Sequence, residues 1–96
     1  MAQFHVYRLP GGRLVLDLQT DLMESGTRVV APLVPATEVP PLGRLHPVLD
    51  LGEVPHTLVT TEMAGLPKAL LRDVAFDLGA RQDDIRRAID MVFSGF

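Results

Sequence analysis

Four side chains near the start of the chain are of the types that cleave a phosphodiester bond by acid–base chemistry: His5, Arg8, Arg13 and Asp17. Such cleavage needs a general acid, a general base and a cation beside the phosphorane. Their spacing is not diagnostic, and twelve Asp and Glu residues outnumber nine Lys and Arg residues, for a formal net charge of −3. This acidic balance disfavours a nucleic-acid groove, so we expect a protein partner and no enzymatic activity.

Other kinds of chemistry find no support in the sequence. The histidines His5, His46 and His56 lie far apart, and none has a ligand-type residue at helical spacing, so no metal site is predicted. The chain contains no Cys, which excludes disulfides and thiol chemistry and is typical of a cytoplasmic protein. Residues 10–12 (PGG) lack the Lys and the helix of a phosphate-binding loop and predict a hairpin turn instead. We therefore expect no cofactor.

Length and hydropathy predict one small domain. The 96 residues, 47% of them hydrophobic, suit a single core over residues 1–96. No apolar run approaches the roughly 20 residues of a membrane-spanning helix, and the first residues do not resemble a secretion signal. We expect a cytoplasmic protein that does not enter membranes.

Alternating apolar residues between turn signals predict an antiparallel sheet of short strands. The expected strands are residues 4–8, 13–18, 27–34, 48–51 and 57–60, with a further strand at 69–72 and one helical turn at 63–65. Pro32 is expected to confine the third strand to an edge or a bulge. Residues 35–47 are rich in proline and predict a long loop of the kind that often contacts a partner.

One amphipathic helix is predicted near the end of the chain, over about residues 80–93. Its apolar residues recur at helical spacing and form one stripe: Ile85, Ala88, Ile89, Val92 and Phe93. Gly79 is the expected N-cap, Gln82 the capping-box residue and Gly95 the point where the helix ends. Solvated faces are expected to carry four arginines: Arg28, Arg81, Arg86 and Arg87. Short strands with one C-terminal helix predict a mainly β (α+β) fold, in which the helix packs on a strongly bent antiparallel sheet.

The chain ends in an apolar tail with two aromatic rings, residues 93–96 (FSGF). Chain termini are usually polar unless something covers them, so these rings either pack in a self-association interface or contact a partner. Phe93 continues the helical stripe and is expected in a core. Phe96 lies beyond the helix, and the sequence leaves burial and partner contact equally open for it.

Short segments, in order along the chain, resemble the CcdB toxin family. They cover residues 3–7 (QFHVY), 18–22 (LQTDL), 30–33 (VAPL), 45–49 (LHPVL), 60–64 (TTEMA) and 84–96 (DIRRAIDMVFSGF). Each segment alone is weak, but their collinear order and spacing over nearly the whole chain make the resemblance specific.

The resemblance implies an SH3-like antiparallel barrel with a C-terminal α-helix, assembled as a homodimer. It also implies a bacterial toxin of a toxin–antitoxin system. Such a toxin inhibits DNA gyrase, a topoisomerase, by binding its A subunit, and has no catalysis of its own. A partly disordered CcdA-like antitoxin would be the remaining partner, and no direct binding of nucleic acid is expected.

The family's gyrase-contacting residues map onto two segments of this chain, one after the second strand and one in the tail. The resemblance predicts these gyrase-binding residues: Thr20, Leu22, Met23, Asp90, Phe93, Ser94, Gly95 and Phe96. In the helix and tail, Ser94 replaces the family's Trp, Phe96 an Ile and Asp90 an Asn, whereas residues 20–23 match the family segment with conservative changes. Losing an aromatic anchor costs about tenfold in affinity or more.

Two alternatives to gyrase inhibition stay open. A ribonuclease toxin on the same barrel, as in the MazF/Kid toxins, would lose RNA cleavage when His5 or Arg13 is changed. A degenerate CcdB homologue would bind an antitoxin or another protein without poisoning gyrase, and Ser94 in place of the family's Trp keeps this alternative open. If expression of the protein stops growth and a resistant gyrase A restores it, the gyrase hypothesis is favoured.

Overall fold

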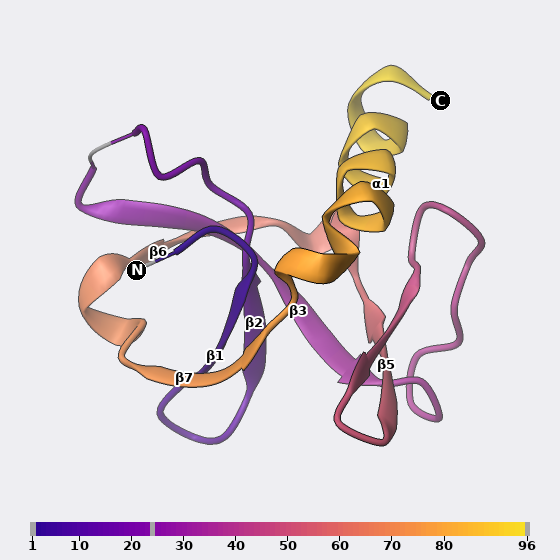
Figure 1. Ribbon diagram of the computed structural model, residues 1–96, viewed down its shortest axis with the longest axis horizontal. Coiled ribbons are helices and arrows are strands. Elements are labelled where there is room, and N and C mark those ends of the chain that lie inside the picture. The colour runs from indigo at the N-terminus through magenta and orange to yellow at the C-terminus, as the bar shows by residue number, and fades with distance from the viewer. Residues whose placement is uncertain (1, 24, 96) are drawn as a thin grey trace.

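The computed structural model describes residues 2–23 and 25–95 (Figure 1). Along this part of the chain the elements are β1 (His5–Arg8), β2 (Leu14–Asp17), β3 (Thr27–Pro35), β4 (Val48–Leu51), β5 (Val54–Leu58), the 3₁₀ turn η1 (Thr60–Glu62), β6 (Ala64–Pro67), the 3₁₀ turn η2 (Lys68–Leu70), β7 (Asp73–Asp77), the 3₁₀ turn η3 (Gly79–Arg81) and α1 (Gln82–Ser94).

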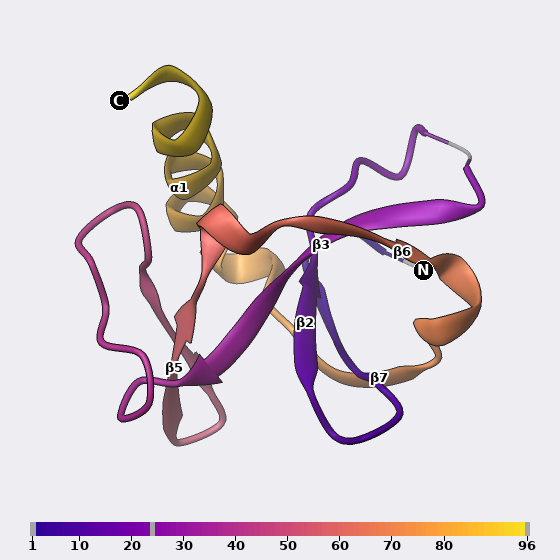
Figure 2. The ribbon, with the colours of Figure 1, turned by 180° about the vertical axis from the view of Figure 1, so that it is seen from behind.

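The strands form one antiparallel sheet in the order β4-β5-β3-β2-β1-β7, and β6 also pairs with β3. The long strand β3 crosses the molecule and is shared between β6, which pairs with its first half, and β5, which pairs with its second half (Figures 1 and 2). The sheet therefore curls into a half-barrel, with α1 as its C-terminal helix. The predicted fold class, mainly β (α+β) with an SH3-like antiparallel barrel and a C-terminal helix, is confirmed.

Pro32 does not place β3 at an edge of the sheet, and that prediction is wrong. β3 has β2 on one side, while β6 and β5 share the other side over residues 27–30 and 33–35. Pro32 falls between these two pairings, where its carbonyl accepts a hydrogen bond from the Val59 N–H at 2.9 Å. Because the partner strand changes at this point, the missing N–H of Pro32 interrupts no strand pairing.

The larger apolar cluster lies on one face of the sheet. Val6, Leu16 and Ala31 stand opposite one another on β1, β2 and β3, and all three are fully buried in this cluster. Ile85 of α1 packs into the same cluster and is also fully buried. The helix therefore covers this face of the sheet and completes its core.

The smaller apolar cluster lies on the opposite face, because side chains of a strand alternate between faces. Tyr7 and Val15 are cross-strand neighbours in this cluster. Leu66 and Leu71, from β6 and the segment after η2, pack onto the same cluster. The middle of the sheet is thus buried on both faces.

The helix begins two residues later than predicted. Gly79 opens the 3₁₀ turn η3, where its N–H donates to Asp77 Oδ1 at 2.9 Å, and α1 itself begins at Gln82 without a side-chain cap. The predicted end is confirmed, because Gly95 adopts a left-handed conformation (φ 79°) and its N–H donates to the Met91 carbonyl at 3.1 Å. Of the helices in the described residues, none is long and apolar enough to cross a membrane.

The region between β5 and α1 differs most from the predictions. Residues 63–65 belong mainly to β6 rather than to a helical turn, and residues 69–72 contain the end of η2 rather than a strand. The strand β7 was not predicted, because its apolar residues are only partly buried or exposed and alternate weakly. β7 takes its strand conformation from pairing with β1.

The proline-rich segment 35–47 is fastened to the sheet by hydrogen bonds. Thr57, fully buried on β5, donates its hydroxyl to the Val39 carbonyl at 2.6 Å. The Ala36 N–H donates to the Pro55 carbonyl, and His46 Nε2 lies 2.9 Å from the Thr61 hydroxyl. These contacts give the segment a defined path beside β4 and β5.

Candidate partner-binding surface

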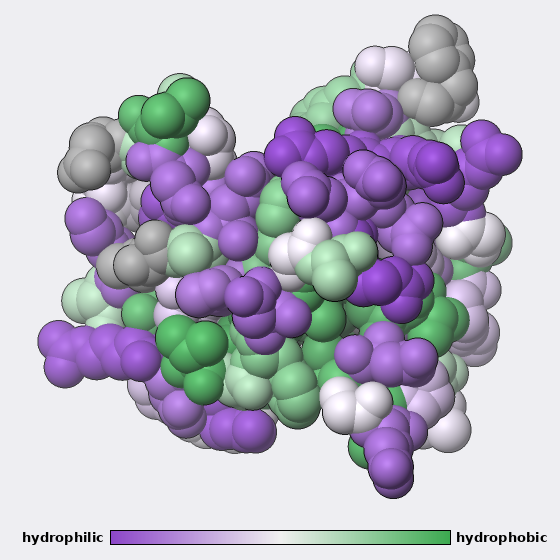
Figure 3. Space-filling view, in the orientation of Figure 1, coloured by the Kyte–Doolittle hydropathy of each residue, from purple (hydrophilic) through white to green (hydrophobic). Residues whose placement is uncertain are grey.

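The predicted site residues lie on two projections. The first is the segment after β2, residues 18–23, called here the 18–23 loop, and the second is the end of α1. Both project from the same side of the molecule as separate features (Figures 1 and 2), with a dip in the surface between them (Figure 3). The structure thus brings the two predicted groups to one side without merging them into one patch.

The 18–23 loop presents two large apolar side chains to solvent. Leu22 is 93% exposed and Met23 is 62% exposed, while Thr20 is also exposed. The loop turns tightly, because the Met23 N–H donates to the Thr20 carbonyl at 3.2 Å and the Leu22 N–H lies 3.3 Å from the Thr20 hydroxyl. A leucine this exposed gains its apolar contacts only when another molecule covers it.

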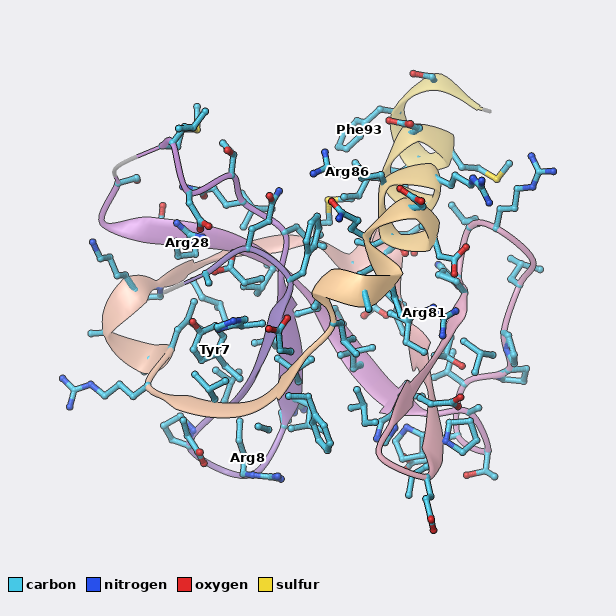
Figure 4. The ribbon with its side chains drawn as sticks, viewed as in Figure 1. Tyr7, Arg8, Arg28, Arg81, Arg86 and Phe93 are labelled. Carbon is cyan, nitrogen blue, oxygen red and sulfur yellow. The ribbon has the colours of Figure 1, made fainter. Side chains whose placement is uncertain are left out.

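The end of α1 is the second projection. Phe93 is 74% exposed, and Asp90, Ser94 and Gly95 are exposed as well. Phe93 therefore does not pack in the core of its own chain, and the prediction that it continues the buried stripe is wrong. The ring extends from the side of α1 nearer the 18–23 loop (Figure 4). Phe96 lies outside the described residues.

The 18–23 loop rests on a buried ion pair that the sequence did not predict. Asp17, the last residue of β2, is fully buried, and Arg28 of β3 is 6% exposed. Arg28 Nε and Nη2 lie 3.0 and 2.8 Å from Asp17 Oδ2. Figure 4 shows Arg28 beneath the loop at the start of β3.

The same guanidinium also binds the loop itself. Arg28 Nη2 donates to the Gln19 carbonyl at 3.0 Å and to Asp21 Oδ1 at 3.1 Å. Asp21 Oδ1 accepts a second hydrogen bond, from the Gln3 N–H at 2.9 Å. One guanidinium therefore joins the end of β2, two residues of the loop and, through Asp21, the start of the chain.

Gln19 adds two further links between this loop and the sheet. Its N–H donates to Asp17 Oδ1 at 3.1 Å, and its side-chain Oε1 accepts from the Val29 N–H at 3.0 Å. In addition, the Leu18 N–H donates to the Val29 carbonyl at 2.9 Å. We call Asp17, Gln19, Asp21 and Arg28 the loop clamp.

The two carboxylates of the loop clamp differ in their proton affinity. Burial raises the pKa of Asp17 above its ordinary value of 3.8, and the hydrogen bonds from Arg28 and Gln19 oppose this rise. The pKa of Asp21 is lowered, first by the hydrogen bond from the Gln3 N–H and then by Arg28. The exposed member of the clamp is thus the better-stabilised anion.

Arg28 was expected on a solvated face, and the structure corrects this. Arg28 and Val30 lie two residues apart on one strand, so their side chains share a face. That face carries the smaller apolar cluster, to which Val30 belongs. Leu66 of β6 and Leu71 after η2 pack onto this cluster. The alternation along β3 was visible in the sequence. The sequence did not show that other parts of the chain cover the face with Arg28 and Val30.

The other three arginines do lie at the surface, as predicted. Arg81 pairs with Asp84 at 2.8 Å with both side chains 41% exposed, and Arg87 lies 3.8 Å from the same carboxyl group. Arg86 is exposed, with its guanidinium carbon 5.3 Å from the centre of the Phe4 ring. A surface hollow of about 220 Å³ is lined in part by Arg44, Arg81 and Arg87.

The four side chains considered for phosphodiester cleavage do not converge. Asp17 is held by Arg28, whereas His5 Nε2 lies 3.6 Å from Asp77 Oδ2. Arg8 lies at the opposite end of β1 from His5, 3.8 Å from Asp73. The two ends of β1 are on the order of 10 Å apart.

Arg13, the fourth of these side chains, lines a separate groove. This groove has a volume of about 590 Å³, and its walls include the Gly11–Gly12 turn, His56 and Glu62. Among residues 2–23 and 25–95, no group of three or more His, Asp or Glu side chains is placed to hold a metal ion.

Comparison with known proteins identifies relatives by sequence and by fold. The family model described as CcdB protein matches residues 3–95. A solved structure titled "Endoribonuclease from Mycobacterial species" is similar with a TM-score of 0.79 and 14% identity, covering 96% of this chain and 89% of that chain. The "Mycobacterium tuberculosis toxin MazF-mt6" is similar with a TM-score of 0.62 and 20% identity, covering 93% of each chain.

The two kinds of likeness carry different weight. At 14% and 20% identity, the likeness to the two solved structures shows a shared fold and nothing about a shared reaction. The family match, in contrast, spans nearly all of the sequence. The chain belongs to the CcdB family, the toxins of toxin–antitoxin systems.

Proposed function

We propose that this protein inhibits DNA gyrase by binding its A subunit as a homodimer, without catalysis of its own. The observation that supports this most is the exposure of Leu22, Met23 and Phe93 on two projections of one side of the molecule. These are positions at which the family resemblance predicts gyrase contact.

The contact energy would come mainly from the apolar side chains. Fully burying a leucine, methionine or phenylalanine side chain contributes about 1.5–3 kcal/mol. Leu22 and Met23 would supply the flank of the interface and Phe93 the helix side. Asp90, Ser94 and Gly95 would supply small or polar contacts around that ring, together with Phe96 beyond the described residues.

A homodimer would double these contacts with gyrase A. A C₂ dimer that places the two helix ends side by side would present four projections to a two-fold symmetric target. Light scattering coupled to size exclusion tests this step, and a folded monomer at micromolar concentration would contradict it.

The antitoxin would be an acidic, partly disordered segment. The hollow lined by Arg44, Arg81 and Arg87 also contains Asp84, so its charged side chains are three cations and one carboxylate, on a protein whose net charge is negative. Arg28, in contrast, is buried in the loop clamp and is not available to a partner. Replacing both Arg44 and Arg87 by Gln should therefore weaken antitoxin binding while leaving gyrase binding unchanged.

A growth assay tests the gyrase proposal in cells. Induced expression should stop growth, and a resistant gyrase A should restore it. A chain truncated after Val92, which lacks residues 93–96, should be harmless although it keeps the buried residues of α1. Growth arrest that a resistant gyrase A does not relieve would reject the proposal, and a folded chain that never arrests growth would favour a degenerate homologue.

A ribonuclease toxin is the second candidate, and one observation favours it. His5 and Asp77 form a partly exposed pair, on the fold shared with an endoribonuclease and a MazF toxin. Incubation of the purified protein with RNA decides between the two candidates. Cleavage that disappears in His5→Ala but persists in the chain truncated after Val92 would establish the ribonuclease, whereas intact RNA would exclude it.

A further inference from the structure

We propose that Arg28 is a positioning residue: with Asp17, Gln19 and Asp21 it holds the 18–23 loop in one conformation that presents Leu22 and Met23 to a partner protein. The inference rests on the proposed function only for the identity of that partner. It concerns a buried polar cluster, whereas the family resemblance predicts contact only at the exposed tip of the loop.

Burial changes sharply over a few residues between the base and the tip of the 18–23 loop. Asp17 and Arg28 are almost completely removed from solvent, whereas Leu22 and Met23 are among the most exposed apolar side chains described. Short loops usually show the opposite distribution, with charges outside and apolar side chains turned in. Here the charges fix the base of the loop, and the apolar side chains are left uncovered at its tip.

The buried ion pair of Asp17 and Arg28 contributes orientation more than stability. Removing two charges from water costs free energy, and apolar residues of similar volume often stabilise a fold as well as a buried ion pair does. The raised pKa of Asp17 agrees with this cost of burial. Stability alone therefore gives little reason for the pair, whereas its directional bonds do what an apolar pair cannot.

The hydrogen bonds of Arg28 connect the sheet to the 18–23 loop. Arg28 donates hydrogen bonds to Asp17 at the end of β2. It also donates to Asp21 and to the Gln19 carbonyl in the loop. The loop conformation is thereby fixed before a partner arrives. A preformed loop loses less conformational freedom on binding than a mobile one, and so gains affinity without any new contact.

Amide hydrogen exchange, with Met23 as the reporter, tests the inference. The Met23 N–H is bonded to the Thr20 carbonyl, and this acceptor is left intact by changes in the loop clamp. In Asp21→Ala, exchange at Met23 should become about tenfold faster or more, while amides in the middle of β3 change by less than about twofold. Asp73→Ala is the matched control, because it removes a similarly exposed carboxylate from another arginine pair.

A second variant separates loop order from overall stability. Asp17→Leu combined with Arg28→Met replaces the ion pair by apolar groups, so the fold should survive. It removes every hydrogen bond from Arg28, and exchange at Met23 should again become about tenfold faster or more. Unchanged exchange at Met23 in both variants, with a folded core, would overturn the inference.

The affinity of each variant for the gyrase A dimerisation core tests whether loop order matters for partner binding. Both variants should bind about tenfold more weakly than wild type, and Asp73→Ala should bind like wild type. Faster exchange with unchanged affinity would overturn the role of the clamp in partner binding. If the wild type itself does not bind, the proposed function fails, and the exchange measurements still decide whether the clamp orders the loop.

Discussion

The two projections of this molecule expose similar apolar side chains but are supported in different ways. The end of α1 is an extension of a regular element, anchored further back by buried Ile85 and Ala88 and closed by Gly95. The 18–23 loop has no regular structure and is held by charged and polar side chains beneath it. A partner-binding surface can thus be built either by prolonging a helix beyond the core or by fastening a loop with directional bonds.

The most severe way to break this comparison is to remove the cation beneath the loop. In Arg28→Met the Asp17 carboxylate stays buried without its partner, and we expect the free energy of unfolding to fall by about 3–5 kcal/mol. Urea unfolding followed by circular dichroism measures this. Arg81→Met is the control, because its pair with Asp84 is half exposed and should contribute less than about 1 kcal/mol. Equal losses in both variants would show that burial of the Arg28 pair is unimportant.

The corresponding change at the helix is Ile85→Ala. This residue is fully buried in the larger cluster, so the cavity left behind should cost about 2–5 kcal/mol. Amide exchange below the global unfolding limit should increase along α1 but stay unchanged at Met23 in the 18–23 loop. Parallel increases in both places would contradict independent support of the two projections.

A substitution at the exposed tip should sharpen the comparison without affecting stability. Ser94→Trp restores the aromatic ring of the family pattern at the end of α1. If the tail contacts gyrase A, the affinity should rise by about tenfold, as expected for an added aromatic anchor. Ser94→Ala is the control for loss of the hydroxyl alone, and a Trp variant that binds like Ser94→Ala would contradict contact at this position.

The smallest expected effect is the pH dependence of the loop clamp. The pKa of Asp21 is lowered from its ordinary value of 3.8, so the stabilisation by this carboxylate is present above that value and is lost as pH falls through its lowered pKa. Asp17, with a raised pKa, acts in the opposite sense, since its ionised form costs stability as pH rises from 3.8 through the raised value.

The contribution of the Asp21 carboxylate can be measured with Asp21→Asn. Near neutral pH, wild type should resist urea better than this variant. The gap between their unfolding midpoints should close in strong acid, where Asp21 is protonated in both folded and unfolded chains. A gap that stays constant into strong acid would mean that the ionised carboxylate is not what stabilises the loop.

The sequence predicted the helix projection better than the loop projection, for a physical reason. Ile85 and Ala88 recur at helical spacing, and Gly95 follows the last turn, so local patterns were enough to place α1 and its end. Periodicity alone predicted a core position for Phe93, because it shows which residues share a face, not where the sheet beneath that face ends.

The loop clamp depends on contacts between segments far apart in the sequence. Arg28 lies eleven residues from Asp17, and its burial depends on β6 and the segment after η2, which were predicted as a helical turn and a strand. The acidic and basic residues were visible, but nothing in their spacing predicted that the face of β3 with Arg28 and Val30 is covered. The available signal was a single arginine on a face of β3 that otherwise carries apolar residues: Val30, Pro32 and Val34.

Titration of the gyrase A dimerisation core from the native host with this protein, by calorimetry, tests the central claim most directly. Wild type should bind tightly. Leu22→Ser combined with Met23→Ser, and separately truncation after Val92, should each weaken binding by about tenfold or more. Val54→Ser, which changes a half-exposed valine at the β4–β5 turn, should bind like wild type. A folded wild-type protein that does not bind, or that binds equally well without either projection, would contradict the account.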